Sequence, residues 1–383
     1  MVNFVAHHFL RCHSKSDNDS ADVSTQVWFA AFEPSNKSHL VATCGGNKVC
    51  IIDAETGKVQ YRYTYPKGLL YTLSWSTACL NNNILATGGT TNTIVLIDML
   101  SESAYLHYSL FQGNNRNKGK VFISSILFHP SQNLLFCALN NGYLYILEFE
   151  THKNRIVNLK RQYSINLKCE IFGLAFCEIK DYLLIATNHG LKGWDNSQSE
   201  DQEIMDFELP KNPNEMYKDQ NENVIDSIEI VKDSWIATKV ALHGVIYIFD
   251  LSATLHKTKN NKCVVKPNYT LQWSDTDNYF MSCSVGLDGK LLACGDDKGS
   301  IWIYNLKEMA FKSSTFDTKV ITVNSVLKWP KLQDKFLKKR KKLEVDVYDI
   351  VMAKCAVHSS GKYLVAVTNN NLVCLYKKST VKK

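Results

Sequence analysis

The sequence lacks the local signatures that accompany most enzymes. It contains no G-x-S-x-G nucleophile elbow and no H-E-x-x-H zinc motif, so serine-hydrolase and metalloprotease chemistry has no support. Residues 113–120 loosely resemble a phosphate-binding loop, but the spacing is one residue too long, and no Ser or Thr follows Lys120. We therefore expect no catalytic activity, no catalytic residues and no cofactor.

Membrane-spanning, secretory and metal-binding patterns are also missing. No apolar run approaches about 18 residues, so no membrane-spanning segment is expected. The N-terminal stretch has neither an uninterrupted apolar core nor a cleavage pattern, so it is not read as a signal peptide. The twelve cysteines include no C-x-x-C pair, and we interpret them as buried reduced thiols of a cytosolic or nuclear protein. The adjacent His7 and His8 would face opposite sides of a strand, so no metal ligands are predicted.

Positive charge is concentrated in one insert and at the C-terminus. The formal net charge is +7, and without these two segments the body is close to neutral, so the chain is not expected to coat nucleic acid. The insert, residues 331–347, is either a solvated loop or a phosphate-binding arm or nuclear-import signal. Its basic residues are Lys335, Lys338, Lys339, Arg340, Lys341 and Lys342.

What the sequence does contain is a repeated unit, best seen in residues 278–306. Three short apolar runs, 279–285, 290–294 and 300–306, are separated by turns rich in Gly and Asp. Such runs predict antiparallel strands joined by tight connections. A small-residue turn followed by an aromatic strand that ends in Asn305 is typical of one WD-type propeller blade.

Six further copies predict a ring of seven blades. The predicted strands are 27–32, 40–46 and 48–53; 70–75, 84–89 and 93–98; 122–128, 134–139 and 143–148; 172–176, 183–188 and 191–195; 223–230, 235–240 and 245–250; 349–357, 363–368 and 372–376. Only Trp194-Asp195 keeps the literal WD pair. One blade buries little surface alone, so the copies are expected to stack into one domain.

The predicted fold is therefore an all-β, seven-bladed WD-repeat β-propeller. Its blades are expected at 26–64, 69–111, 121–160, 170–209, 222–273, 277–329 and 348–377, with 320–329 as the outer strand of the sixth. The last copy shows three strands before the chain ends, so residues 4–12 are expected to add its outermost strand. This pairing would close the ring and remove an open sheet edge.

Aromatic residues recur at one register of the innermost strands. Trp28, Tyr71 and Phe172 each precede a second aromatic residue by four positions, and Tyr279-Phe280 opens the sixth copy. In a ring these positions converge on one rim of the channel. A cluster of these aromatic rings, with Asp275 and Asp277 nearby, would bind a quaternary ammonium such as methylated lysine. Alternatively, the aromatic residues wedge neighbouring blades together.

Several segments carry a resemblance to a known family. The sequence resembles the propeller of the leucine-rich-repeat and WD-repeat-containing protein that associates with the origin recognition complex, and more distantly the embryonic-ectoderm-development propeller of Polycomb complexes. The matching segments are 8–34, 41–59, 191–195, 234–250, 271–306 and 326–330 for the first, and 69–75 and 278–306 for the second.

The resemblance implies a nuclear, chromatin-associated adaptor. Its partners would be origin recognition complex subunits, methylated histone H3 or H4 tails and other chromatin proteins, and it would act in heterochromatin and DNA replication. By motif, the Polycomb propeller's trimethyl-lysine cage corresponds to Trp28, Tyr71, Tyr279 and Phe280, whereas Phe172 lies outside it. Tyr279 replaces a Trp and Phe280 a Tyr.

One feature sets a limit on what the resemblance implies. The chain begins at the propeller without leucine-rich repeats, so we interpret it as a fragment, a split gene product or a propeller-only variant. The alternatives are a protein-interaction scaffold without a methyl-lysine site, a Polycomb-type subunit, and direct nucleic-acid binding through the basic insert.

Overall fold

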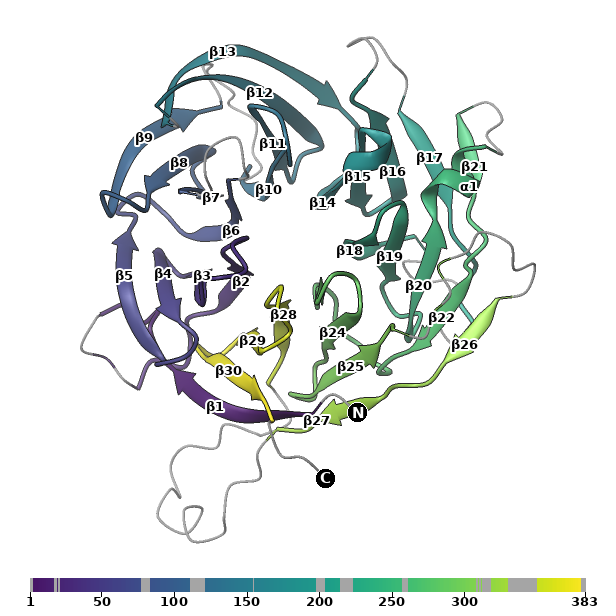
Figure 1. Cartoon of the computed structure of the whole chain (residues 1–383). Helices are drawn as coiled ribbons and strands as arrows, with labels where there is room; N and C mark the ends of the chain where they lie inside the picture. The colour runs from purple at the N-terminus through teal and green to yellow at the C-terminus, as the bar shows by residue number, and fades with distance from the viewer. Residues whose placement is uncertain are drawn as a thin grey trace, which may run out of the picture.

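The computed structural model describes residues 3–16, 19, 21–76, 83–110, 121–153, 155–197, 204–213, 223–256, 261–307, 309, 311, 318–329 and 350–379. Seven β-sheets stand side by side around a central channel, and each sheet is one blade (Figure 1). The chain is thus a seven-bladed β-propeller, as the repeats predict. No helix among the described residues is long and apolar enough to cross a membrane.

The blades follow one another in chain order. Blade one contains β2 (Val27–Phe32), β3 (Leu40–Gly45), β4 (Lys48–Asp53) and β5 (Lys58–Thr64). Blade two contains β6 (Leu70–Trp75), β7 (Ile84–Gly89), β8 (Thr93–Asp98) and β9 (Ser103–Ser109). Blade three contains β10 (Ile123–Phe128), β11 (Leu134–Leu139), β12 (Tyr143–His152) and β13 (Arg155–Asn166).

The next two blades each have a fifth strand. Blade four contains β14 (Ile171–Cys177), the short helix η2 (Glu178–Lys180), β15 (Tyr182–Thr187), β16 (Gly190–Asp195), β17 (Met205–Glu208) and β21 (Lys262–Val264). Blade five contains β18 (Ile225–Lys232), β19 (Trp235–Val240), β20 (Val245–Asp250), α1 (Leu251–Leu255), β22 (Tyr269–Gln272) and β26 (Lys319–Ile321).

The last two blades complete the ring. Blade six contains β23 (Cys283–Gly286), β24 (Leu291–Gly295), β25 (Ile301–Asn305) and β27 (Ser325–Leu327). Blade seven contains β28 (Met352–Val357), β29 (Tyr363–Thr368), β30 (Val373–Lys378) and β1 (Phe4–Leu10). The antiparallel pairing of β1 with β30, from Phe4–Lys378 to Leu10–Val373, is the predicted closure.

Residues 320–329 do not form one outer strand of blade six, so that prediction was wrong. Their first part belongs to β26, which pairs in parallel with β22 of blade five, and β27 alone completes blade six. In the same way β21 pairs in parallel with β17 of blade four. These added parallel strands provide hydrogen-bond partners for backbone groups at the outer edges of blades four and five. Three-residue strands carry no periodic pattern, so the sequence did not reveal them.

His7 and His8 correct a second expectation. A register shift in β1 between Ala6 and His8 breaks the alternation of side chains. Nε2 of each ring therefore lies within hydrogen-bond distance of the Glu55 carbonyl oxygen, at 2.8 and 3.3 Å, with the ring centroids 3.9 Å apart. The two rings share one partner rather than facing opposite sides of the strand.

The core is divided among the seven blade interfaces. Seven clusters of buried apolar residues each combine side chains from two neighbouring blades, and the last joins blade seven to blade one. A propeller needs this arrangement because each blade exposes apolar faces on both sides. The eleven described cysteines are all free thiols, and all are buried as predicted.

Candidate functional site

A β-bulge recurs at the start of the innermost strand of six blades. In each, pairing with the next strand slips by one residue, so one residue of the inner strand stands unpaired. A bulge changes the direction in which the side chain of the extra residue points. All six of these residues line the central cavity: Trp28, Tyr71, Ser124, Phe172, Asp226 and Ala353.

Glycines opposite two of the bulges explain why the chain bends there. Gly45 pairs with Val27, and Gly89 pairs with Leu70, at the points where the bulges begin. A Cβ atom on Gly45 would lie 2.6 Å from the Gln26 carbonyl oxygen, and one on Gly89 would lie 1.9 Å from that of Leu69. Only glycine allows this close approach of backbones, so the glycines help to present Trp28 and Tyr71 to the channel.

The structure gathers aromatic rings where the innermost strands begin. The Trp28 and Tyr71 ring centroids lie 5.5 Å apart, edge to face, and Tyr71 contacts Phe122 at 5.2 Å. From other blades, Phe172 contacts Phe280 at 5.0 Å. All five rings line one cavity of about 910 Å³. Trp28 and Tyr71 are half-buried rather than enclosed between blades.

Not every predicted residue joins this group. Tyr279 is absent from the cavity lining and contacts Phe280 instead, with ring centroids 6.2 Å apart. Both precede β23 rather than lying in it, so residues 279–285 are not one strand as predicted. Phe122 was missed because it lies two residues before the bulge, off the register shared by Trp28 and Tyr71. The sequence could still have indicated Phe122, because this residue begins the predicted inner strand of the third blade.

Phe280 is the most exposed ring at the mouth and has an unusual backbone. It is 47% exposed, and its φ of 65° lies in the left-handed region, which bulky residues rarely adopt. Its backbone N–H donates to Oδ2 of Asp226 at 3.1 Å. Strained residues of this kind persist where the surroundings hold them and often mark functional sites.

A buried ion pair lies behind Phe280. Lys239 Nζ lies 2.5 Å from Asp226 Oδ2, with the two side chains only 1% and 0% exposed. Lys239 also lies over the Trp273 ring, 4.5 Å from its centroid. Burial raises the pKa of Asp226, whereas the Lys239 charge acts to lower it. Such a pair is costly to break because either charge alone would be buried without a partner.

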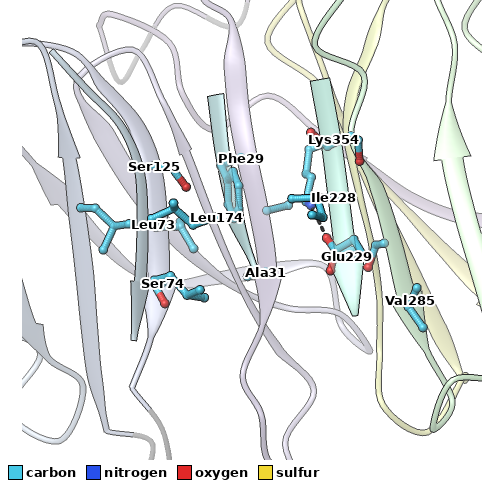
Figure 2. A pocket seen from close by; sticks show the side chains of 18 of the residues that line it. Phe29, Ala31, Leu73, Ser74, Ser125, Leu174, Ile228, Glu229, Val285 and Lys354 are labelled. Carbon is cyan, nitrogen blue, oxygen red and sulfur yellow. Dashed lines mark hydrogen bonds and ion pairs between the residues drawn. The ribbon is translucent and has the colours of Figure 1, made fainter. Parts of the chain in front are cut away.

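A second ion pair lies in the channel lining and joins blades five and seven past the inner strand of blade six (Figure 2). Lys354 Nζ of β28 bonds Oε1 of Glu229, from β18, at 2.7 Å and the Cys283 carbonyl oxygen at 3.0 Å. It also lies 5.1 Å from the centroid of the Phe29 ring. Burial alone would lower the pKa of Lys354, but the charge and hydrogen bond of Glu229 outweigh it and the pKa is raised. The channel thus already holds one ammonium between a carboxylate and an aromatic face.

The cavity lining is acidic overall. The described lining residues include one ammonium, that of Lys354, and five carboxylates: Glu33, Glu170, Asp226, Glu229 and Asp288. Asp226 and Glu229 are paired with Lys239 and Lys354. Glu33 and Asp288 follow the far ends of β2 and β23, away from the rings at the strand starts. Asp275 and Asp277, predicted as the acidic residues near the rings, are not in the lining. Burial raises the pKa of the Tyr71 phenol. The mouth therefore combines aromatic ring faces with the carboxylate of Glu170, which suits a cation with an apolar shell.

The predicted basic patch cannot be placed beside this mouth. Its residues, Lys335, Lys338, Lys339, Arg340, Lys341 and Lys342, and the whole 331–347 insert lie outside the described residues.

Comparison with known proteins gives a consistent family over nearly the whole chain. The model of the WD domain of leucine-rich repeat and WD repeat-containing protein 1 matches residues 2–379. The Xenopus tropicalis protein of that name is 30% identical over 97% of this chain, and the human protein is 24% identical over 96%. The chain spans about half the length of these relatives, 54% and 57% respectively. WD-repeat propellers are generally non-enzymatic protein-interaction scaffolds.

Proposed function

Because the chain belongs to the family of the WD domain of leucine-rich repeat and WD repeat-containing protein 1, we propose that it is a chromatin adaptor that reads trimethyl-lysine on histone tails. The modified side chain would enter the aromatic mouth of the channel. The observation that carries the proposal is that five aromatic residues from separate segments line one cavity: Trp28, Tyr71, Phe122, Phe172 and Phe280.

The chemistry of the mouth favours this ligand over a neutral one. Cation–π attraction contributes about 0.5 to 2 kcal/mol for each well-placed ring. A trimethyl-ammonium keeps its charge but has no N–H to donate, so ring faces replace water around it at little cost. The carboxylate of Glu170, in the lining just before β14, adds a favourable potential without any need for direct contact.

The wider role is proposed from the family resemblance. The propeller would act in the nucleus, bound to chromatin, and join methylated histone H3 or H4 tails to origin recognition complex subunits on another part of its surface. Neither the complex nor the compartment follows from the channel geometry. Pull-down of the purified chain with recombinant origin recognition subunits tests this part separately from peptide binding.

Peptide titration tests the proposed reader directly. Histone H3 and H4 peptides with and without trimethyl-lysine are titrated against the wild-type chain and against Trp28→Ala and Tyr71→Ala. Both variants should lose selective binding of the methylated peptides while circular dichroism and the thermal midpoint stay close to wild type. Phe9→Ala, an exposed aromatic change in β1 on the outer rim, is the matched control and should bind normally. Equal affinity in all four proteins would contradict the proposal.

One observation favours a second candidate, a scaffold without a methyl-lysine site. Trp28, Tyr71 and Phe122 contact one another at 5.5 and 5.2 Å, so the rings also satisfy each other across blades one to three. In that case Trp28→Ala would lower stability by about 3 to 5 kcal/mol, the ordinary cost of a large aromatic truncation in a core. Wild-type protein would then show no preference for methylated peptides.

A further inference from the structure

Three potential metal ligands meet where the ring closes. Sγ of Cys12, Sγ of Cys50 and a ring nitrogen of His13 all lie within 4.8 Å of one another. Cys12 and His13 follow β1, the closing strand of blade seven, whereas Cys50 lies in β4 of blade one. The three residues are 5%, 0% and 0% exposed. Cys12 and Cys50 are 38 positions apart, so no short sequence motif announces the group.

The His13 ring is already held in place. One ring nitrogen, Nε2, lies 2.8 Å from Thr43 Oγ1, and Nδ1 lies 3.2 Å from the Gly45 carbonyl oxygen. Whichever nitrogen binds a metal, the other keeps an oxygen partner. Metal-ligating histidines almost always have such a partner, because it fixes the tautomer and the ring orientation.

We propose that Cys12, His13 and Cys50 bind one Zn²⁺ ion. Two thiols and one imidazole are ligands that Zn²⁺ prefers. Ligand atoms around a tetrahedral Zn²⁺ lie roughly 3.5 to 3.8 Å apart, so the group needs to contract by no more than about 1.3 Å. No other Cys, His, Asp or Glu of the described residues joins the group, so the protein would supply three ligands and leave the fourth position to water.

Charge balance makes such an ion acceptable in a buried position. On binding, each thiol gives its proton to solvent, and two thiolates with one Zn²⁺ form a neutral centre. A neutral centre avoids the large cost of burying a net charge. The Cys50 thiol, which now donates to the Cys12 carbonyl oxygen at 3.2 Å, exchanges that bond for a bond to the metal.

The ion would link two blades, although with three protein ligands its site stays open, unlike a closed structural zinc site with four. Cys12 and Cys50 belong to the apolar cluster that joins blade seven to blade one. A metal bound there would link the segment after the closing strand to the first blade. Because unfolded chain has no assembled site, metal affinity would appear as stability of the closed ring.

Metal analysis of the full chain tests the site. The protein is produced with added zinc and purified in the presence of a thiol reductant without chelator, and then examined by native mass spectrometry and elemental analysis. We expect one zinc per chain. After zinc removal, Co²⁺ should give a near-ultraviolet thiolate-to-cobalt charge-transfer band. Zinc should raise the thermal midpoint by about 3 °C or more, reversibly on chelation.

Substitutions show whether these residues hold the ion. Cys12→Ala and Cys50→Ala should weaken Zn²⁺ binding by more than about 100-fold. His13→Gln keeps a hydrogen-bonding side chain and serves if either cysteine variant fails to fold. Cys44→Ala, in the neighbouring strand β3 and equally buried, should bind zinc normally. A folded wild-type chain with no zinc and no charge-transfer band, or equal loss in Cys44→Ala, would overturn the proposal.

Discussion

The backbone N–H of Phe280 donates a hydrogen bond to the carboxylate of Asp226 at 3.1 Å. Asp226 is the bulged residue of blade five, and it occupies the register at which blades one, two and four carry Trp28, Tyr71 and Phe172. Blade five therefore has a buried carboxylate at the register where those three blades have an aromatic ring. Its role is to hold the strained Phe280 backbone, which brings a further ring to the mouth.

Replacing Asp226 should therefore affect stability and ligand affinity in separable ways. Asp226→Leu leaves the ammonium of Lys239 buried without a partner and should cost about 3 to 5 kcal/mol of unfolding free energy, measured by urea denaturation. Adding Lys239→Met should recover most of that loss. Methyl-lysine affinity should stay low in both, because Phe280 N–H still lacks its acceptor.

Asp226→Asn is the matched control for that prediction. Its amide oxygen can still accept from Phe280 N–H, so peptide affinity should fall less than in Asp226→Leu even though Lys239 loses its counter-charge. If the double variant Asp226→Leu/Lys239→Met is as unstable as the single Leu variant, the ion pair is not the source of the cost.

Phe122, which the sequence pattern missed, should matter more for ligand binding than Tyr279. Phe122 lines the cavity and contacts Tyr71, whereas Tyr279 is outside the lining. Phe122→Ala should lower the affinity for a trimethyl-lysine peptide by about 2- to 30-fold, the loss expected for one ring. Phe122→Leu keeps apolar volume without a ring face and should bind nearly as weakly. A larger loss in Tyr279→Ala than in Phe122→Ala would contradict this assignment.

The sequence predicted the propeller fold because each blade repeats one local pattern of apolar runs and turns. The β2, β4, β6, β7 and β8 bounds coincide with the predicted strands, since apolar runs between Gly and Asp turns define them. The sequence predicted only some of the aromatic residues that line the cavity mouth. Trp28 and Tyr71 share a register with a bulge, but the bulge itself depends on pairing with a neighbouring strand. Phe280 reaches the mouth through a left-handed backbone and a contact with Asp226, 54 positions away.

The Glu229–Lys354 pair should stabilise the ring by joining blades five and seven past the inner strand of blade six. Lys354 is 10% exposed and Glu229 is 29% exposed, so water screens the pair more than the one at Asp226. Glu229→Gln should cost about 1 to 3 kcal/mol, measured by urea denaturation. In a double-mutant cycle with Lys354→Met the two losses should not add, because each change removes the same contact. Additive losses would show that the two residues stabilise the ring independently.

Asp22 should make ring closure sensitive to acid. It lies in the segment between β1 and β2 and accepts bonds from Thr25 Oγ1 at 2.6 Å, the Ser24 backbone N–H at 2.9 Å and the Lys15 backbone N–H at 3.0 Å. Burial opposes ionisation, but these donors together hold the pKa of Asp22 well below its ordinary value. Its carbonyl oxygen also accepts from Asn371 Nδ2 of blade seven at 2.9 Å, so the same segment connects both sides of the closure.

The sign of the pH dependence follows from the lowered pKa. A carboxyl whose pKa is lower in the folded chain contributes stability above its unfolded pKa of about 3.9, and that contribution is lost as the pH falls through the folded value. Asp22→Asn should thus lower the thermal midpoint at pH 7, by the equivalent of about 1 to 2 kcal/mol. The difference from wild type should shrink steadily below about pH 4. Asp19→Asn, an exposed change in the same segment, is the control and should track wild type throughout. A difference between Asp22→Asn and wild type that persists unchanged at pH 2 would mean that the amide disturbs packing rather than charge.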